Sequence, residues 1–269
     1  MTPKRFRDLV LAHYERAGRH TLPWRKTKDA YRVLVSEIML QQTQVERVIP
    51  LYAAFLAEFP TIEALAKAPL ARVLTRWQGL GYNRRAKMLH DAAKAVVRDY
   101  KGRMPRTVSA LDALPGVGHY TARAVAAFAF NEDVVLIETN VRTAVTHHFF
   151  LGEEKVSDKD ILPILDRALP RGDARRWYAA LMDYGAFLKR SGIRINARNA
   201  SYTKQKTFKG SDREARGLIL KALSLKPATQ AVLRSLASPD RGEQLQAQLA
   251  KLVAEGLVEK QGTRYQLPS

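Results

Sequence analysis

The stretch Leu114-Pro115-Gly116-Val117-Gly118-His119-Tyr120-Thr121-Ala122 is the part of the sequence that decides the fold. Glycine has no Cβ, so its two glycines let the backbone come close to an anion. The alanine-rich segment that follows predicts a helix, whose first N–H groups would point at the same anion. Such a contact holds a phosphate whatever the base sequence is. An ordinary tight turn between helices is the alternative. The complete stretch favours DNA contact, made by Leu114, Gly116, Val117, Gly118, His119 and Thr121.

The chain is strongly basic, because its 269 residues include 45 Lys and Arg against 26 Asp and Glu, a formal charge of +19. A monomer with this charge repels itself, so the composition indicates a polyanionic partner, with nucleic acid ahead of an acidic membrane surface. The sequence has no cysteine, which excludes disulfides and thiolate metal sites. The charged N-terminus and the lack of any apolar run near ~18 residues predict a cytoplasmic protein with no membrane partner. We also expect a monomer that associates with the nucleoid.

Most of the first 188 residues follow a helical pattern, with apolar side chains at three- and four-residue spacing. Breaks are expected at Gly18, Pro23, Pro50 and Pro60, and strand patterns are nearly absent, so we expect an all-α domain. The predicted helices cover residues 6–17, 31–42, 45–58, 61–66, 70–77, 84–100, 108–114, 120–130, 139–150, 157–169 and 174–188.

The composition changes after Leu188, and residues 189–210 form a basic segment with no periodicity. Helices are then expected over residues 212–223, 229–236 and 243–255, followed by two short strands about a glycine turn within residues 256–267. Helices followed by a small hairpin predict a winged-helix-like module over residues 211–269. A helical cap that only shields the main core is the alternative.

Residues 114–122, together with Asn140-Val141-Arg142, resemble the helix-hairpin-helix DNA glycosylase superfamily that includes endonuclease III. Three further motifs resemble the MutY-type adenine glycosylases within it: Leu22-Pro23-Trp24-Arg25, Ser36-Glu37-Ile38-Met39-Leu40-Gln41-Gln42-Thr43-Gln44-Val45 and Trp77-Gln78-Gly79-Leu80-Gly81-Tyr82. The resemblance extends over residues 6–188. It implies a two-lobed core over residues 1–188, in which the N- and C-terminal segments share one lobe.

Glu37 lies in an otherwise apolar helix, where burial would raise its pKa and let it keep a proton near neutral pH. The resemblance implies that Glu37 protonates the leaving base; an exposed helix carboxylate is the alternative. The resemblance also implies that Gln41, Gln42 and Tyr82 enter the DNA stack when the target base is flipped out. The remaining DNA contacts expected around these motifs are Arg25, Thr43 and Arg84.

Position 120 distinguishes two mechanisms in this superfamily. Members that also cut the strand have a lysine there, which forms a Schiff base with the sugar. This chain has Tyr120, so the resemblance implies a monofunctional glycosylase that uses water, with Tyr120 and Asn140 positioning water and sugar.

Glu138 departs from the family, which has an aspartate at this position. A carboxylate is kept, so Glu138 can still stabilise the sugar cation and act as a base. One more methylene moves its oxygens by about 1.5 Å. The alternative is that Glu138 only caps the helix that follows.

The family's iron–sulfur cysteines are also missing. Their positions align with Lys189, Asn196, Asn199 and Gln205, so no cluster is expected. No other metal or cofactor is predicted, except that a structural cation at the hairpin carbonyls is left open. Basic residues in this segment, including Lys189 and Arg190, are expected to meet DNA, and a solvated linker is the alternative.

These observations predict an enzyme of base excision repair that removes a mispaired or damaged base from double-stranded DNA. Adenine opposite 8-oxoguanine or guanine is the favoured target. However, residues 211–269 do not resemble the large C-terminal domain that reads 8-oxoguanine in MutY-type enzymes, so we expect that domain to be missing. A glycosylase for thymine, uracil, deaminated or alkylated bases is therefore an alternative, as is a non-catalytic protein that binds lesions. A transcription regulator built on the winged helix would leave the first 188 residues unexplained.

Overall fold

The computed structural model of the chain describes residues 1–193, 195 and 207–269. The chain is mostly helical, as the sequence predicts, and separates into two compact units. Unit 1 comprises Met1–Glu37, Arg106–Ala113 and Val117–Lys204, and unit 2 comprises Ile38–Pro105, Leu114–Gly116 and Gln205–Ser269. The predicted boundaries at residues 188 and 210 stay predictions, and most of the basic segment 189–210 lies outside the described residues.

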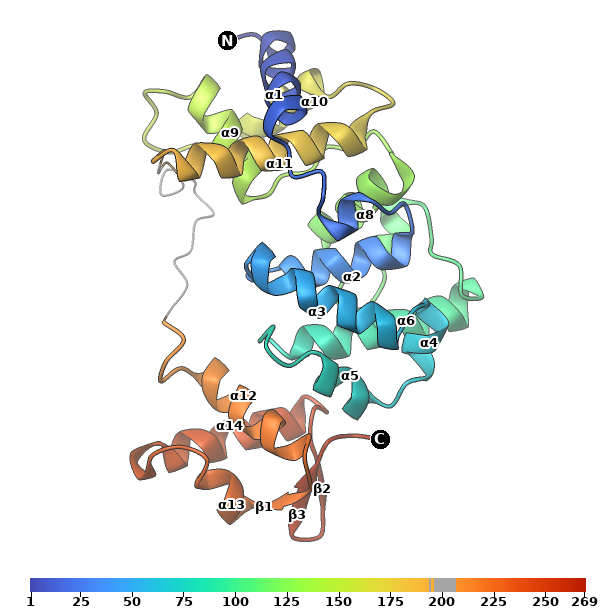
Figure 1. Cartoon of the computed structure of the whole chain (residues 1–269), viewed down its shortest axis with the longest axis vertical. Helices are drawn as coiled ribbons and strands as arrows, with labels where there is room; N and C mark the ends of the chain where they lie inside the picture. The colour runs from blue at the N-terminus through green and yellow to red at the C-terminus, as the bar shows by residue number, and fades with distance from the viewer. Residues whose placement is uncertain (194, 196–206) are drawn as a thin grey trace. The chain divides into compact units, whose positions relative to one another are not determined.

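Unit 1 is built from helices around α11 (Figure 1), against which α1, α8 and α9 pack. Phe6, Trp177 and Tyr178 are fully buried there, and Phe6 meets the Trp177 ring edge-on. Local signals set the helix starts: Thr2 accepts a hydrogen bond from the Arg5 N–H ahead of Pro3. The helices are α1 (Pro3–Ala17), α2 (Ala30–Leu40, whose last turn belongs to unit 2), α7 (Val108–Asp112), α8 (His119–Phe130), α9 (Thr139–Phe149), α10 (Asp158–Ala168), α11 (Ala174–Arg190) and the 3₁₀ helix Pro23–Arg25.

Unit 2 has its core where α4 and α5 pack on α6, with Leu65, Leu74 and Leu89 almost fully buried. Its elements are α3 (Val45–Glu58), α4 (Ile62–Lys67), α5 (Leu70–Arg76), α6 (Arg84–Tyr100), α12 (Asp212–Leu223), α13 (Gln230–Arg234), α14 (Gly242–Ala254), the 3₁₀ helix Pro239–Arg241, and strands β1 (Ala228–Thr229), β2 (Glu259–Gln261) and β3 (Arg264–Gln266).

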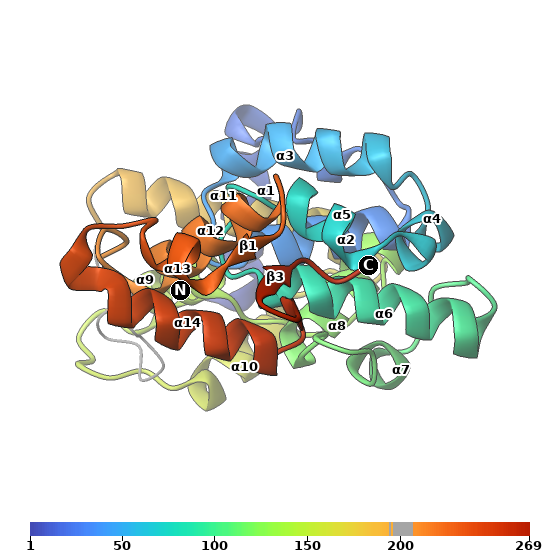
Figure 2. The ribbon, with the colours of Figure 1, turned by 90° about the horizontal axis from the view of Figure 1, so that it is seen from below.

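The C-terminal part of unit 2 is the predicted winged-helix-like module, drawn in orange and red (Figure 2). Its antiparallel sheet has the order β1-β3-β2, so Tyr265 faces Ala228 on one side and Lys260 on the other. The sequence predicted the β2–β3 hairpin but not β1, because a two-residue strand is too short for any alternation to show. The Ala71 N–H donates to the Pro268 carbonyl, which ties the end of the chain to α5 within unit 2.

Two local expectations were wrong. Pro50 does not interrupt α3: it lies on the exposed face of the helix, while Val48, Tyr52 and Phe55 on the other face are buried. A proline there removes one backbone hydrogen bond, and the buried face holds the helix together. Helix α2 ends at Leu40 rather than at Gln42, which has a left-handed backbone with φ of 55°. Among the described residues, no helix is long and apolar enough to cross a membrane.

Candidate active site

Glu37 is buried in unit 1 near the end of α2, with 8% of its surface exposed. Its neighbours in the helix, including Val33, Leu34 and Ile38, are almost fully buried, which explains why the carboxyl is removed from water. Burial raises the pKa of Glu37 to about 7; the charge of Glu138 acts in the same direction, and the Tyr120 hydrogen bond opposes it. A carboxyl with this pKa holds a proton in a large share of molecules at neutral pH and can donate it.

Tyr120 lies in the first turn of α8, and its hydroxyl donates a hydrogen bond to Oε2 of Glu37 over 3.2 Å. Burial raises the pKa of Tyr120 well above its ordinary value, and the charges of Glu37 and Glu138 raise it further. The phenol therefore stays protonated and serves as a hydrogen-bond donor. It carries no amine, so Tyr120 cannot form a Schiff base.

Glu138 is the N-cap of α9. Its Oε1 accepts hydrogen bonds from the N–H groups of Asn140 at 2.7 Å and Val141 at 2.8 Å, and its Oε2 accepts from Asn140 Nδ2 at 3.2 Å. Burial raises the pKa of Glu138, whereas these backbone N–H groups and the charge of Lys189 lower it. The capping role considered from the sequence is therefore present. It fixes the carboxyl beside the groups that would do the chemistry, and its charge acts on Glu37 and Tyr120.

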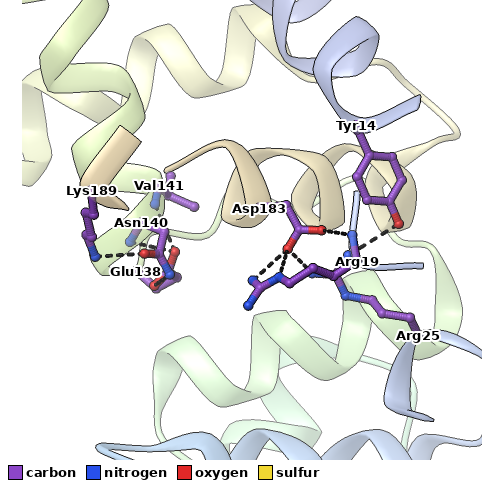
Figure 3. Close-up of polar contacts among 8 residues, drawn as sticks. All are labelled: Tyr14, Arg19, Arg25, Glu138, Asn140, Val141, Asp183 and Lys189. Carbon is purple, nitrogen blue, oxygen red and sulfur yellow. Dashed lines mark hydrogen bonds and ion pairs between the residues drawn. The ribbon is translucent and has the colours of Figure 1, made fainter. Parts of the chain in front are cut away.

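Lys189, in the last turn of α11, contacts the Glu138–Asn140 pair. Its Nζ donates to Asn140 Oδ1 over 2.7 Å (Figure 3). The sequence predicted a DNA contact for Lys189, because it looked like one more residue of the basic segment. Its neighbour Arg190 is exposed, as a DNA contact requires. We call Glu37, Tyr120, Glu138, Asn140 and Lys189 the acid cluster.

A second group of polar residues, centred on Asp183 of α11, orders the loop before α2 (Figure 3). Asp183 is 2% exposed and accepts from the Arg19 N–H at 2.7 Å, from Arg19 Nε at 2.8 Å and from Arg25 Nη2 at 3.3 Å. Arg25 also donates to the Tyr14 hydroxyl, and its charge lowers the pKa of Glu37. Arg25, predicted to contact DNA, is thus largely enclosed within unit 1.

The turn between α7 and α8 has the backbone expected of a hairpin. Gly116 has a φ of 71°, and a Cβ there would overlap the Met88 side chain, so glycine is required on both counts. Gly118 is the N-cap of α8 and, like Gly116 and His119, is exposed. The side chains of Leu114, Val117 and Thr121 are buried, which leaves backbone groups and His119 as the parts of this turn that can meet a phosphate.

Unit 2 contains a half-buried cation, Arg85, that was not among the residues predicted from the sequence. Arg85 Nη1 donates to the carbonyls of Ile38 at 2.7 Å, Met39 at 3.3 Å and Gln41. Its Nη2 donates to Leu80 O at 3.1 Å, Gly81 O at 3.2 Å and Thr43 Oγ1 at 3.3 Å. We call this group the Arg85 cluster. Burial lowers the pKa of Arg85 to about 10, so it stays charged at neutral pH.

The missed signal was periodicity in α6. Arg85 precedes the buried residues Leu89, Ala92 and Val96 by four, seven and eleven positions, which is the spacing of one helix face. Arg84, which the sequence predicts to contact DNA, is exposed on another face of the helix.

Gln41, Gln42 and Tyr82 line one cavity of about 470 Å³ in unit 2, together with Arg84, Gly116 and Arg213. Gln42 and Tyr82 both have left-handed backbones, with φ of 55° and 47°. Arg213 comes from α12 of the C-terminal module: Nη1 donates to the Tyr82 hydroxyl over 3.0 Å, and the guanidinium lies 5.2 Å from the centre of the Tyr82 ring. The sequence analysis did not identify Arg213.

Residues 35–171 match the model of the HhH-GPD superfamily base excision DNA repair proteins, and the chain belongs to this superfamily. The chain is 38% identical to an adenine DNA glycosylase from Mycolicibacterium smegmatis, over 93% of this chain and 92% of that protein. An adenine DNA glycosylase from Mycobacterium tuberculosis is 36% identical over 93% of this chain and 88% of its own length. The human adenine DNA glycosylase is 43% identical over 56% of this chain and 29% of its length.

Solved structures show the same fold. A thermostable thymine-DNA glycosylase superposes with a TM-score of 0.60 and 28% identity, over 68% of this chain and 86% of that one. A trapped covalent intermediate of endonuclease III with DNA superposes with a TM-score of 0.59 and 18% identity, over 70% of this chain and 87% of that one. The resemblance found in the sequence motifs is therefore confirmed, as is the helical fold, and the chain ends in the small three-stranded antiparallel sheet described above.

Proposed function

We propose that the chain is an adenine DNA glycosylase that removes adenine opposite 8-oxoguanine or guanine and leaves the strand uncut. The observation that carries the proposal is Glu37, a buried carboxyl with a pKa of about 7 that is hydrogen-bonded to Tyr120. The relatives named as adenine DNA glycosylases, matched over nearly the whole chain, support adenine as the target.

In the proposed reaction, the bond between the sugar C1′ and the base nitrogen breaks, and its electron pair leaves with the base. Glu37 gives its proton to the departing base, because the neutral base is a far better leaving group. Glu138 stays ionised and stabilises the positive charge that develops on the sugar. Water then adds to C1′ and passes a proton to one of the two carboxylates, while Tyr120 and Asn140 orient it.

Two carboxyls with different environments make this division of labour feasible. Glu37 accepts one hydrogen bond from Tyr120, so burial dominates and the carboxyl keeps its proton. Burial raises the pKa of Glu138 as well, but the carboxylate accepts three hydrogen bonds and has a lysine charge close by, and these oppose burial and favour the anion. The two groups also repel each other as anions, so the ionised Glu138 helps to keep Glu37 protonated.

DNA contact is part of the same proposal. Exposed backbone at Gly116, Gly118 and His119 is available to a phosphate, at the start of a helix of twelve residues. Gln41, Gln42 and Tyr82 would enter the stack beside the flipped nucleotide, and the left-handed backbones of Gln42 and Tyr82 support this, because strained conformations gather at functional sites. We further propose that the protein acts on double-stranded DNA as a monomer.

A glycosylase for another base is the second candidate, favoured by the structural likeness to a thymine-DNA glycosylase. A labelled duplex with adenine opposite 8-oxoguanine, guanine, cytosine or thymine is incubated with the protein and treated with alkali to break abasic sites. Parallel duplexes carry T:G, U:G, hypoxanthine and alkylated bases. We expect alkali-dependent breaks at adenine opposite 8-oxoguanine and guanine. Breaks confined to the parallel duplexes would replace adenine as the target, and no break in any duplex would contradict a glycosylase function.

A further inference from the structure

Among the described residues, Lys189 is the one whose charged side-chain group is seen to donate a hydrogen bond to the Glu138–Asn140 pair. Its position follows from the sequence of α11, because Gly185 lies one helical turn before it on the same face. A Cβ at Gly185 would overlap the Asn140 carbonyl, so the glycine allows α11 to lie directly against the start of α9. Lys189 therefore meets Asn140 because the two helices touch there.

The hydrogen bonds form an ordered chain from Lys189 through Asn140 to Glu138. The ammonium group of Lys189 can only donate, so the Asn140 side chain must turn its Oδ1 toward Lys189. This leaves Asn140 Nδ2 pointing at Oε2 of Glu138, over 3.2 Å. A lysine at position 189 thus sets which way the amide faces, and the amide in turn constrains the carboxylate oxygen that the backbone does not hold.

Charge works in the same direction. Burial lowers the pKa of Lys189 and Glu138 raises it, while Lys189 lowers the pKa of Glu138. Arg142 of α9, which pairs with Asp158, also lowers the pKa of Glu138. Tyr120 of α8 and Arg25 act instead on the pKa of Glu37. Lys189 therefore opposes the cost of keeping Glu138 ionised in a buried place.

We propose that Lys189 is a positioning residue for base excision, which orients Asn140 and holds Glu138 as the anion while Glu37 carries the proton. This proposal rests on the proposed function. It replaces the DNA contact expected from the sequence with a role inside the acid cluster.

The test measures single-turnover excision and duplex binding separately, across a range of pH, for the parent protein, three variants of Lys189 and one control variant. Lys189→Met removes both the charge and the donor, Lys189→Gln keeps a donor without charge, and Lys189→Arg keeps the charge. Lys159→Met, on the exposed face of α10, is the matched control. We expect Lys189→Met to slow excision by about 10- to 100-fold with unchanged duplex affinity, since small displacements at a reacting centre have effects of this size.

The pH profile separates positioning from a merely structural role. The acidic limb of the rate profile is where Glu138 takes up a proton. Without the Lys189 charge, this limb should move upward by about one pH unit, as expected for the loss of a neighbouring opposite charge. Lys189→Arg should return the limb to its place, and Lys189→Gln should restore part of the rate without moving the limb back. If Lys189→Met instead weakens duplex binding and leaves the rate and the limb unchanged, Lys189 is a DNA contact and the proposal is wrong.

A second readout does not depend on activity. The carboxyl of Glu138 can be titrated by ¹³C NMR in the free protein, and Lys189→Met should raise its midpoint relative to the parent and to Lys159→Met. An unchanged midpoint overturns the proposal even if no duplex is cleaved. Conversely, an inactive parent protein whose Glu138 midpoint shifts as expected would contradict the proposed function while supporting the arrangement around Lys189.

Discussion

The acid cluster of unit 1 and the Arg85 cluster of unit 2 both keep a charged group away from water, with opposite consequences. Burial brings the pKa of Glu37 up to about 7, inside the range where a proton can be exchanged. Burial brings the pKa of Arg85 down only to about 10, so its charge is permanent at neutral pH. The same desolvation cost therefore yields a group that can exchange a proton in one unit and a fixed cross-link between backbone segments in the other.

The largest expected effect concerns Glu138, the carboxyl of the acid cluster that the proposed reaction keeps ionised. Glu138→Gln keeps a carbonyl oxygen that can accept from the Asn140 and Val141 N–H groups, but it removes the charge. We expect single-turnover excision to slow by about 10²- to 10³-fold, the usual effect of removing one electrostatic contact to a transition state. The thermal midpoint should change little, because the cap of α9 remains. A variant that cleaves every duplex as fast as the parent would show that Glu138 only caps the helix.

Replacing Arg85 is expected to lower the stability of unit 2, because its guanidinium links several backbone segments there. Arg85→Met would leave several carbonyls between Ile38 and Gly81 without their donor, and each buried group left unsatisfied costs about 1–3 kcal/mol. We expect the free energy of unfolding in urea to fall by about 3 kcal/mol or more. Arg84→Met, one residue earlier and exposed, should change it by less than about 0.5 kcal/mol. Equal effects of the two variants would contradict the role given to Arg85.

The free energy of unfolding should also depend on pH, because the carboxyl of Glu37 is buried. The pKa of Glu37 in the folded protein, about 7, is above its ordinary value of 4.5, so the folded state binds more protons between these values. The contribution of Glu37 to stability is therefore present below pH 4.5 and is lost as the pH rises to 7. Glu37→Gln should be more stable than the parent by about 3 kcal/mol at pH 8 and no more stable at pH 4. Urea unfolding at the two pH values measures this; a constant difference would mean that the carboxyl is not buried in solution.

The smallest expected effect concerns the cavity next to the Arg85 cluster. Tyr82→Leu keeps an apolar side chain but removes the ring and the hydroxyl that accepts from Arg213. Affinity for a mismatched duplex should fall by about 1–2 kcal/mol, the scale of one base–aromatic stacking contact. Fluorescence anisotropy measures the affinity. An effect of the same size on a non-specific duplex would remove Tyr82 from lesion recognition.

Much of the fold was predictable, because the helical pattern is long and its boundaries carry strong local signals. The predicted limits of α3, α6 and α12 agree with the structure at both ends. Glu37 was also predictable as a buried group, since apolar residues flank it on the same helix. The sequence could not show β1, whose two residues pair with a strand more than thirty residues away.

Contacts between distant segments account for the features of the site that the sequence could not show. Lys189 looked like part of a basic segment because its partner Asn140 is 49 residues away, and only the close packing at Gly185 brings the two together. Arg213 lies 131 residues from Tyr82 and carries no local signal. The sequence predicted a DNA contact for Arg25, and it could not show the contact with Asp183, which spans 158 positions.

The central claim is that Glu37 supplies the proton for base excision. The most direct test is the single-turnover rate of adenine excision opposite 8-oxoguanine from pH 5 to 9, for the parent and for Glu37→Gln. The parent rate should fall as the pH rises past about 7, where Glu37 loses its proton. Glu37→Gln should bind the duplex normally but react about 10³-fold more slowly, in keeping with the loss of a general acid. A Glu37→Gln protein that excises adenine at the parent rate, or a parent rate that stays constant through pH 9, would contradict the account.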